Sequence, residues 1–249
     1  MRLEALAQIR VVLVEPSHPG NIGAAARAMK TMGLSRLVLV NPTAFPHPDA
    51  VAMASGADDV LAAAEVHSRL EAAIAPCHRV YGLSARLRAL EWPMRSPGRC
   101  AVEIVQGEEA PVALLFGRER SGLTNEELAR CHALVHIPAN PDYSSLNVAQ
   151  AVQVMAYLLR RMALEEGAPV LDSRGTGYPP ARAEQLEGFF AHLESVLYRT
   201  GFLEPQRPGR MMLRLRRLFL RAEPDEKEVN ILRGILSAVE DCCEGTRRG

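Results

Sequence analysis

Hydrophobic positions in the first 165 residues gather in short apolar runs, and stretches of small residues separate them. Five runs predict strands, at residues 10–14, 36–40, 80–83, 112–116 and 133–137. These runs show little apolar–polar alternation, which is typical of parallel strands that are covered on both faces. We therefore expect an α/β fold, with a mostly parallel sheet and helices on both faces.

Helical spacing fills much of the chain between and after these runs. The pattern predicts helices at residues 20–31, 55–61, 68–74, 125–130 and 147–166, the last with a single apolar face. Residues 167–180 lose this periodicity and gain Gly and Pro, which indicates a linker. Three further helical patterns follow, at residues 181–200, 209–221 and 225–240. We expect one domain over residues 1–166 and a small helical C-terminal extension over residues 181–249.

Composition narrows the class of protein. The net charge is zero, and no apolar run approaches the roughly twenty residues of a membrane span. The first residues also lack the apolar stretch of a signal peptide, so we expect a cytoplasmic protein without membrane contact. The five cysteines show no Cys-x-x-Cys or Cys/His spacing, so no metal site is expected.

A basic helix is predicted within the C-terminal extension. Residues 209–221 combine an apolar stripe with arginines, among them Arg210, Arg214 and Arg217. These three are candidate RNA-binding residues, because arginine forms bidentate contacts with phosphate. A solvated charged face on a packed helix explains the pattern equally well, and the extension could support a dimer instead.

The first of three chemical motifs is VVLVEPSHPGNIGAAARAM, which begins at Val11. It predicts a buried strand, a turn and a helix of small residues, with Asn21 and Arg27 as its polar members. Neither the dinucleotide-binding Gly pattern nor the Walker pattern is present, which counts against a dinucleotide-dependent oxidoreductase. Arg27 could also be only a solvated surface residue.

The second and third motifs each join a strand to a helix. PVALLFGRERSGLTNEEL, from Pro111, places Gly117 and Glu119 at the carboxyl end of a strand, where open α/β sheets bind ligands. VHIPANPDYSSLNVAQAV, from Val135, places Ser145 and Asn147 at the start of the long helix. A surface acid and a helix cap are the alternative interpretations.

The three motifs together resemble the SpoU/TrmH branch of the SPOUT RNA methyltransferases, and within it the TrmJ-type tRNA (cytidine/uridine) 2′-O-methyltransferases. The resemblance covers nearly the whole chain. It rests on NIGAAARA, FGRERSGLT and YSSLNVAQAV in this order, with LSAR at residues 83–86 and LRRLF and NILRGIL near the C-terminus. The resemblance implies a C-terminal trefoil knot in the catalytic domain and a homodimer whose sites are completed across the interface.

The resemblance also implies a cofactor and a set of site residues. The cofactor is S-adenosylmethionine, and its contacts fall on Leu83, Ser84, Ala85, Gly117, Glu119, Ile137, Pro138, Ser145, Leu146 and Asn147. The catalytic residues implied are Arg27, Ser145, Asn21 and Glu119, with Arg27 assisting deprotonation or orienting the ribose oxygen.

The substrate implied is tRNA, methylated on the ribose 2′-hydroxyl of cytidine or uridine at position 32 of the anticodon loop, and no DNA binding is expected. A ribosomal RNA methyltransferase would share all three motifs. A non-catalytic RNA-binding protein that has kept the fold is the alternative from another class.

Overall fold

The computed structural model describes residues 2–84, 92–107, 110–165, 178–204 and 210–246. The chain divides into two compact units, residues 1–173 and residues 174–249, and each is described here by itself. Most of the predicted linker at residues 167–180 lies outside the described residues.

A seven-stranded sheet forms the centre of the first unit, and all its strand pairs are parallel. Its spatial order is β3-β2-β1-β6-β4-β7-β5. The strands are β1 (Ile9–Val14), β2 (Arg36–Val40), β3 (Glu65–His67), β4 (Arg79–Leu83), β5 (Met94–Arg95), β6 (Val112–Phe116) and β7 (Ala133–Val135). The five predicted strands are confirmed, although β7 ends two residues earlier than expected. Edge strands β3 and β5 were not predicted, because two or three residues carry too little pattern.

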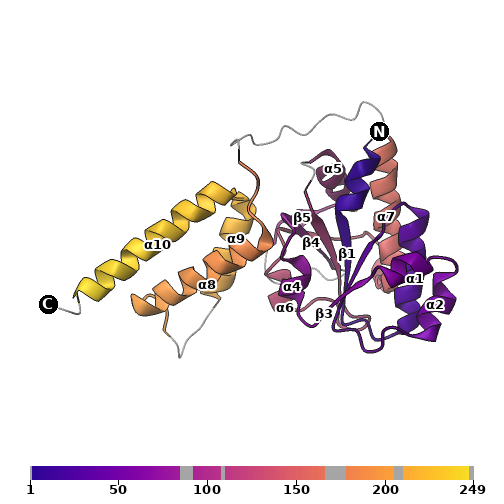
Figure 1. Cartoon of the computed structure of the whole chain (residues 1–249), viewed down its shortest axis with the longest axis horizontal. Coiled ribbons are helices and arrows are strands. Elements are labelled where there is room, and N and C mark those ends of the chain that lie inside the picture. Colours follow the sequence, from indigo (N-terminus) through magenta and orange to yellow (C-terminus); the bar gives the residue numbers. More distant parts are fainter. Residues whose placement is uncertain (1, 85–91, 108–109, 166–177, 205–209, 247–249) are drawn as a thin grey trace. The chain divides into compact units, whose positions relative to one another are not determined.

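Helices cover both faces of this sheet, as predicted (Figure 1). Helices α1, α2, α5 and α7 lie on one side and α4 and α6 on the other. The first group is α1 (Pro19–Thr31), α2 (Pro48–Ala54), α5 (Pro97–Gln106) and α7 (Val148–Leu164). The remaining helices are η1 (Leu3–Gln8), α3 (Asp58–Ala62), α4 (Leu70–Ile74), α6 (Asn125–Leu128) and η2 (Pro141–Tyr143).

Three details of the helix prediction are wrong, and one is that α2 was not predicted. The helix expected at residues 55–61 begins only at Asp58, because Ser55 and Gly56 adopt positive φ angles of 47° and 88° and separate it from α2. Helix α5 was not predicted at all, although Ser96 caps it by accepting a hydrogen bond from the Arg99 amide.

Close packing of α1 depends on its small residues. A Cβ atom on Gly23 would lie 2.0 Å from the Ala50 carbonyl oxygen, so glycine lets α1 and α2 touch backbone to backbone. The other side of α1 packs on α7, whose Val152, Met155 and Leu159 are buried as the apolar spacing predicted. This packing fixes the starts of α1 and α7, where two of the three motifs lie.

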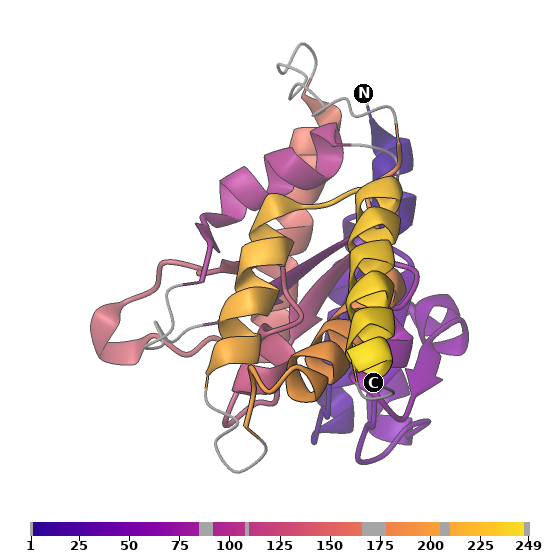
Figure 2. The same ribbon diagram turned by 90° about the vertical axis from the view of Figure 1, so that its left-hand side faces the viewer.

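The second unit contains α8 (Ala183–Arg199), α9 (Met211–Ala222) and α10 (Glu226–Thr246), close to the predicted ranges. Helices α9 and α10 run in opposite directions (Figure 2). Phe189 and Phe190 of α8 pack with Phe219 of α9, with ring centroids 4.8 Å apart for Phe189 and Phe219. No helix among the described residues is long and apolar enough to cross a membrane.

Candidate active site

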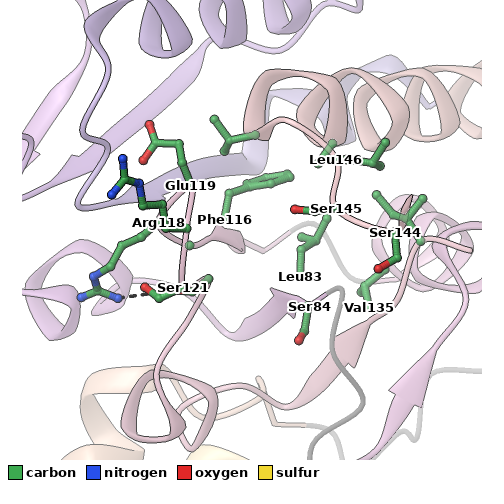
Figure 3. Close-up of a pocket in the computed structure, with 16 residues that line it drawn as sticks. Leu83, Ser84, Phe116, Arg118, Glu119, Ser121, Val135, Ser144, Ser145 and Leu146 are labelled. Carbon is green, nitrogen blue, oxygen red and sulfur yellow. Dashed lines mark hydrogen bonds between the residues drawn. The ribbon is translucent and has the colours of Figure 1, made fainter. Parts of the chain in front are cut away.

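A pocket of about 260 Å³ opens at the carboxyl ends of β4, β6 and β7 (Figure 3). Parallel strands of open α/β sheets bind ligands at this end. The residues that line the pocket come from the ends of these strands and from the start of α7: Leu83, Ser84, Phe116, Gly117, Arg118, Glu119, Arg120, Ser121, Gly122, Val135, Ile137, Ser144, Ser145, Leu146, Val148 and Ala151.

Most of the predicted cofactor residues line this pocket. They are Leu83, Ser84, Gly117, Glu119, Ile137, Ser145 and Leu146. Pro138 is exposed and Asn147 caps α7, and neither is part of the lining; Ala85 lies outside the described residues. Sequence reasoning missed Phe116, Val135 and Val148, which looked like ordinary core residues because they continue buried strands or a buried helix face.

The lining has the character of a nucleoside site. Apolar side chains, among them Phe116, Ile137 and Leu146, line the pocket together with polar ones, among them Ser84 and Ser145. Cofactor sites typically combine an apolar lining with polar groups that fix the orientation of the ligand. The residues present therefore fit the adenosine part of the implied cofactor, and no cluster of metal-binding side chains occurs among the described residues.

Glu119 is held at the rim of the pocket by several donors. Its carboxylate accepts hydrogen bonds from the backbone amides of Ser17 and His18 at 3.2 Å each, and from the Ser17 hydroxyl at 3.0 Å. The Asn21 side-chain amide donates a further bond at 3.1 Å. Partial burial acts to raise the pKa of Glu119, but these donors outweigh it and hold the pKa below its usual range. Glu119 is therefore a carboxylate at neutral pH.

Asn21 links this carboxylate to the third motif. Its side-chain oxygen accepts a hydrogen bond from the Asn147 side-chain amide at 2.9 Å. Asn147 in turn caps α7, because its side-chain oxygen accepts from the Ala149 amide at 2.9 Å and its backbone amide donates to Gln150. The cap interpretation of Asn147 is thus correct, and the same side chain also belongs to a chain of hydrogen bonds, Glu119–Asn21–Asn147, that joins all three motifs.

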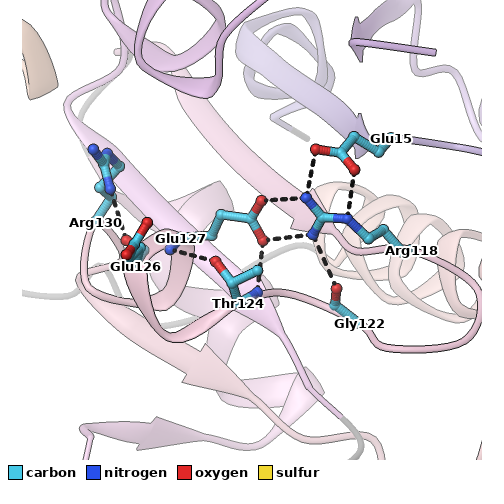
Figure 4. A network of polar contacts seen from close by, with 7 residues as sticks. All are labelled: Glu15, Arg118, Gly122, Thr124, Glu126, Glu127 and Arg130. Carbon is cyan, nitrogen blue, oxygen red and sulfur yellow. Dashed lines mark hydrogen bonds and ion pairs between the residues drawn. The ribbon is translucent and has the colours of Figure 1, made fainter.

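Arg118 anchors the loop at residues 117–122, which lines the pocket, through two ion pairs (Figure 4). Its guanidinium contacts Glu15, at the end of β1, at 2.6 and 2.7 Å, and forms a bidentate pair with Glu127 of α6 at 3.0 Å. Glu127 also completes a capping box with Thr124. Hydrogen bonding to Arg118 lowers the pKa of Glu15. This clamp fixes residues 117–122 between the end of β1 and helix α6.

Gly117 is required by the way this loop folds back on itself. A Cβ atom at this position would lie 2.2 Å from the Gly122 carbonyl carbon and 2.3 Å from the Leu123 nitrogen. The Gly122 amide donates to the Arg118 carbonyl at 2.9 Å, which closes the turn. Glycine is therefore the residue that allows the two ends of the loop to cross beside the pocket.

The remaining predicted residues are not part of the pocket lining. Arg27 is exposed on α1, and its guanidinium has no hydrogen-bond partner in the described part of the chain. Arg210 and Arg214 are exposed at the start of α9, whereas Arg217 is half-buried. A fourth arginine of this helix, Arg216, packs at 4.5 Å over the Phe190 ring and pairs with Glu187, so one part of the basic pattern is structural.

Two family models match the chain. The SpoU rRNA Methylase family model matches residues 8–157, and a model described as tRNA methyltransferase TrmJ, C-terminal domain, matches residues 184–248. The two matches fall on the two compact units.

Individual relatives agree with these matches. The tRNA (cytidine/uridine-2′-O-)-methyltransferase TrmJ of Klebsiella pneumoniae is 51% identical over 244 residues, which is 96% of this chain and 99% of the relative. The crystal structure of TrmJ from Z. mobilis ZM4 has a TM-score of 0.83 at 37% identity, and the match covers 94% of this chain and 100% of that chain.

A shorter solved structure is also similar. It is described as giving insights into 2-OH methylation of C/U34 on tRNA, with a TM-score of 0.51 at 27% identity, and it covers 63% of this chain and 97% of that one. Together, the two matched models and the near full-length relatives show that the chain belongs to the SpoU methylase family, in its TrmJ group.

Proposed function

We propose that this chain transfers a methyl group from S-adenosylmethionine to the ribose 2′-hydroxyl of cytidine or uridine in a tRNA anticodon loop, at position 32. The observation that carries the proposal is the hydrogen-bond chain Glu119–Asn21–Asn147, which joins three motifs at the rim of a nucleoside-like pocket. The names of the near full-length relatives support the same reaction.

S-adenosylmethionine supplies an electrophilic methyl group on a sulfonium, and the chain must present the ribose oxygen in line with it. Leu83, Ile137 and Leu146 would hold the adenosine part, and Gly117 would let backbone approach it. Ala85, Pro138 and Asn147 complete the cofactor contacts that we propose. No metal ion is needed, because a sulfonium leaves as a neutral thioether.

The polar residues of the rim have positioning roles in this proposal. Glu119 stays ionised and keeps Asn21 and the 17–18 backbone in place, so the acceptor side of the pocket is pre-organised. Ser145, in the segment before α7, orients the reacting groups, and Asn147 holds the start of that helix.

Arg27 is the residue that we propose to orient the 2′-oxygen, through contact with a neighbouring phosphate. Arginine stays protonated in proteins, so orientation is a better physical role for it than proton abstraction. Because its guanidinium lies outside the pocket of its own chain, this role fits a homodimer in which Arg27 of one protomer reaches the pocket of the other.

The fold carries two further parts of the proposal. Strand β6 lies between β1 and β4, and β7 lies between β4 and β5, so later strands are inserted between earlier ones. This order supports the trefoil knot that the family implies.

We assign residues 1–166 to the methyltransferase domain, residues 167–180 to a linker, and residues 181–249 to an extension that binds tRNA through Arg210, Arg214 and Arg217. A tRNA substrate places the reaction in the cytoplasm.

The test uses the full chain with labelled S-adenosylmethionine and unmodified tRNA. Nuclease digestion and mass spectrometry then locate the ribose methyl group. We expect methylation at position 32, lost in Arg27→Ala while cofactor binding measured by calorimetry is retained. Arg36→Ala is the matched control, because Arg36 is an exposed arginine at the amino end of β2.

Other outcomes would support a different target position or one of the alternative functions. Methylation at position 34 would contradict the proposed position but keep the reaction. Methylation of ribosomal RNA alone would identify ribosomal RNA, and not tRNA, as the substrate. Cofactor binding without methylation of either RNA would favour a non-catalytic RNA-binding protein.

A further inference from the structure

A second hollow lies beside the cofactor pocket and shares part of its wall. It measures about 500 Å³, is open to solvent, and is lined by residues that follow β1, β2 and β6. The segment from Arg118 to Ser121 lines both hollows. A ligand in the second hollow would therefore adjoin a ligand in the first along this segment.

The second hollow is polar and charge-balanced. Glu15 is paired with Arg118, and the Glu119 carboxylate is satisfied by donors from the first motif. Arg120 differs from these, because it is exposed and its guanidinium forms no hydrogen bond or ion pair within the described ranges. The wall also offers Asn41 and Thr43, so it suits a neutral group with several hydrogen-bonding atoms and an anion near Arg120.

Asn41 is presented by an unusual backbone. It directly follows β2, has a φ of 46°, and donates its backbone amide to the His67 carbonyl at 2.8 Å. Its side-chain amide has no hydrogen-bond partner in the part of the chain that the structure describes. Asparagine tolerates left-handed backbone better than most residues, so this position can present an amide without the strain that another polar residue would meet.

We propose that this hollow is the subsite for the acceptor nucleotide, with Asn41 reading the pyrimidine base and Arg120 contacting an adjacent phosphate. The proposal rests on the proposed function. An amide carries one acceptor oxygen and two N–H donors. By rotating half a turn, it pairs with the N3–H and O4 of uridine or with the N3 and amino group of cytidine. Asn41 thus allows both pyrimidines to be accepted.

Base contacts and phosphate contacts predict different kinetic signatures. The Asn41→Asp variant keeps the size of the side chain but leaves only acceptors, so it keeps one bond to each base, from the uridine N3–H or the cytidine amino group, and repels uridine O4 or cytidine N3. We expect its kcat/KM to fall about tenfold on both tRNAs, with the cytidine-to-uridine ratio little changed. Arg120→Ala should raise the KM about fivefold for both tRNAs equally, with kcat unchanged.

The experiment measures kcat and KM of the full chain on two transcripts that differ only in cytidine or uridine at the target position, and cofactor affinity by calorimetry. Asn41→Gly removes the amide while keeping the left-handed backbone, and should lower kcat/KM about fivefold on both transcripts. Cofactor affinity should stay within about twofold in both Asn41 variants, and Arg36→Ala should behave as the unsubstituted chain. Thermal melting confirms that each variant is folded.

Two results would overturn the subsite. One is an Asn41→Asp variant whose kcat/KM on both transcripts stays within about twofold of the unsubstituted chain. The other is a loss of cofactor affinity in Asn41→Gly, which would assign the hollow to the cofactor instead. If the unsubstituted chain methylates neither transcript, the proposed function itself fails and the subsite fails with it.

Discussion

The polar side chains of the two compact units make different kinds of contact. In the first unit, Glu119, Asn21 and Asn147 converge at one end of the sheet and join segments up to 126 residues apart in the sequence. In the second unit, the polar pairs connect neighbouring helices side to side, as Arg199 does with Glu240 at 2.7 Å. Polar groups that meet at one end of the sheet can form a binding site. Ion pairs between neighbouring helices stabilise the helix packing and leave other charged side chains exposed.

Glycine shows the same contrast. Gly117 in the first unit sits where added atoms would collide with backbone, while Gly188 and Gly234 in the helices of the second unit have open space at the Cβ position. Gly117 is therefore required by close approach of the chain. Gly188 and Gly234 cost helix stability without a packing reason.

The largest effect is expected from Gly117→Ala. Because the new methyl group would overlap the backbone at Gly122, the pocket loop must open, and we expect cofactor binding to fall below detection by calorimetry. Gly188→Ala is the matched control, since it should raise the free energy of unfolding by about 0.5–1 kcal/mol and leave cofactor affinity unchanged. If Gly117→Ala bound the cofactor within about threefold of the unsubstituted chain, the close approach of Gly117 to the Gly122 backbone would be contradicted.

A smaller effect should separate two arginines that are both paired. Arg118→Gln removes the clamp between Glu15 and Glu127, so we expect cofactor affinity to fall about tenfold or more. Arg216→Gln removes the pair with Glu187 and the contact with Phe190, and should lower the free energy of unfolding by about 1–3 kcal/mol without changing cofactor affinity. Calorimetry and chemical denaturation measure the two quantities. Equal cofactor affinities in the two variants would show that Arg118 supports the cofactor pocket no more than Arg216 does.

The smallest effect concerns an exposed arginine of α9. Arg214→Ala should weaken tRNA binding a few-fold and reduce the slope of log affinity against log salt by about one, as expected for one phosphate contact. Arg199→Ala is the control from the same unit, because Arg199 is already paired with Glu240. Binding titrations at several salt concentrations make the comparison. An unchanged slope for Arg214→Ala would move the tRNA surface away from α9.

Much of the architecture followed from local pattern. The runs at residues 36–40 and 112–116 match β2 and β6 residue for residue, because every position of β6 and all but Arg36 of β2 are buried and apolar. Strands β3 and β5 escaped prediction, since their pairing comes from neighbours in space and not from their own two or three residues.

The site was predictable in its chemistry but not in its contacts. Gly117, Glu119, Asn21 and Asn147 could be singled out from motif residues alone. That Asn21 bridges Glu119 and Asn147, and that Asn41 stands beside the same loop, depends on strands that lie far apart in the chain but adjacent in the sheet.

By itself, the sequence determined most of the helices, the central strands and the residue types available for chemistry, because hydrophobic periodicity and turn residues act over short distances. Only the tertiary structure decided which of those residues meet. It packs Arg216 against its own unit and leaves Arg27 and Arg214 exposed, although all three occur in similar amphipathic patterns. The physical reason is that a contact between distant residues depends on strand order and helix packing, which no single segment encodes.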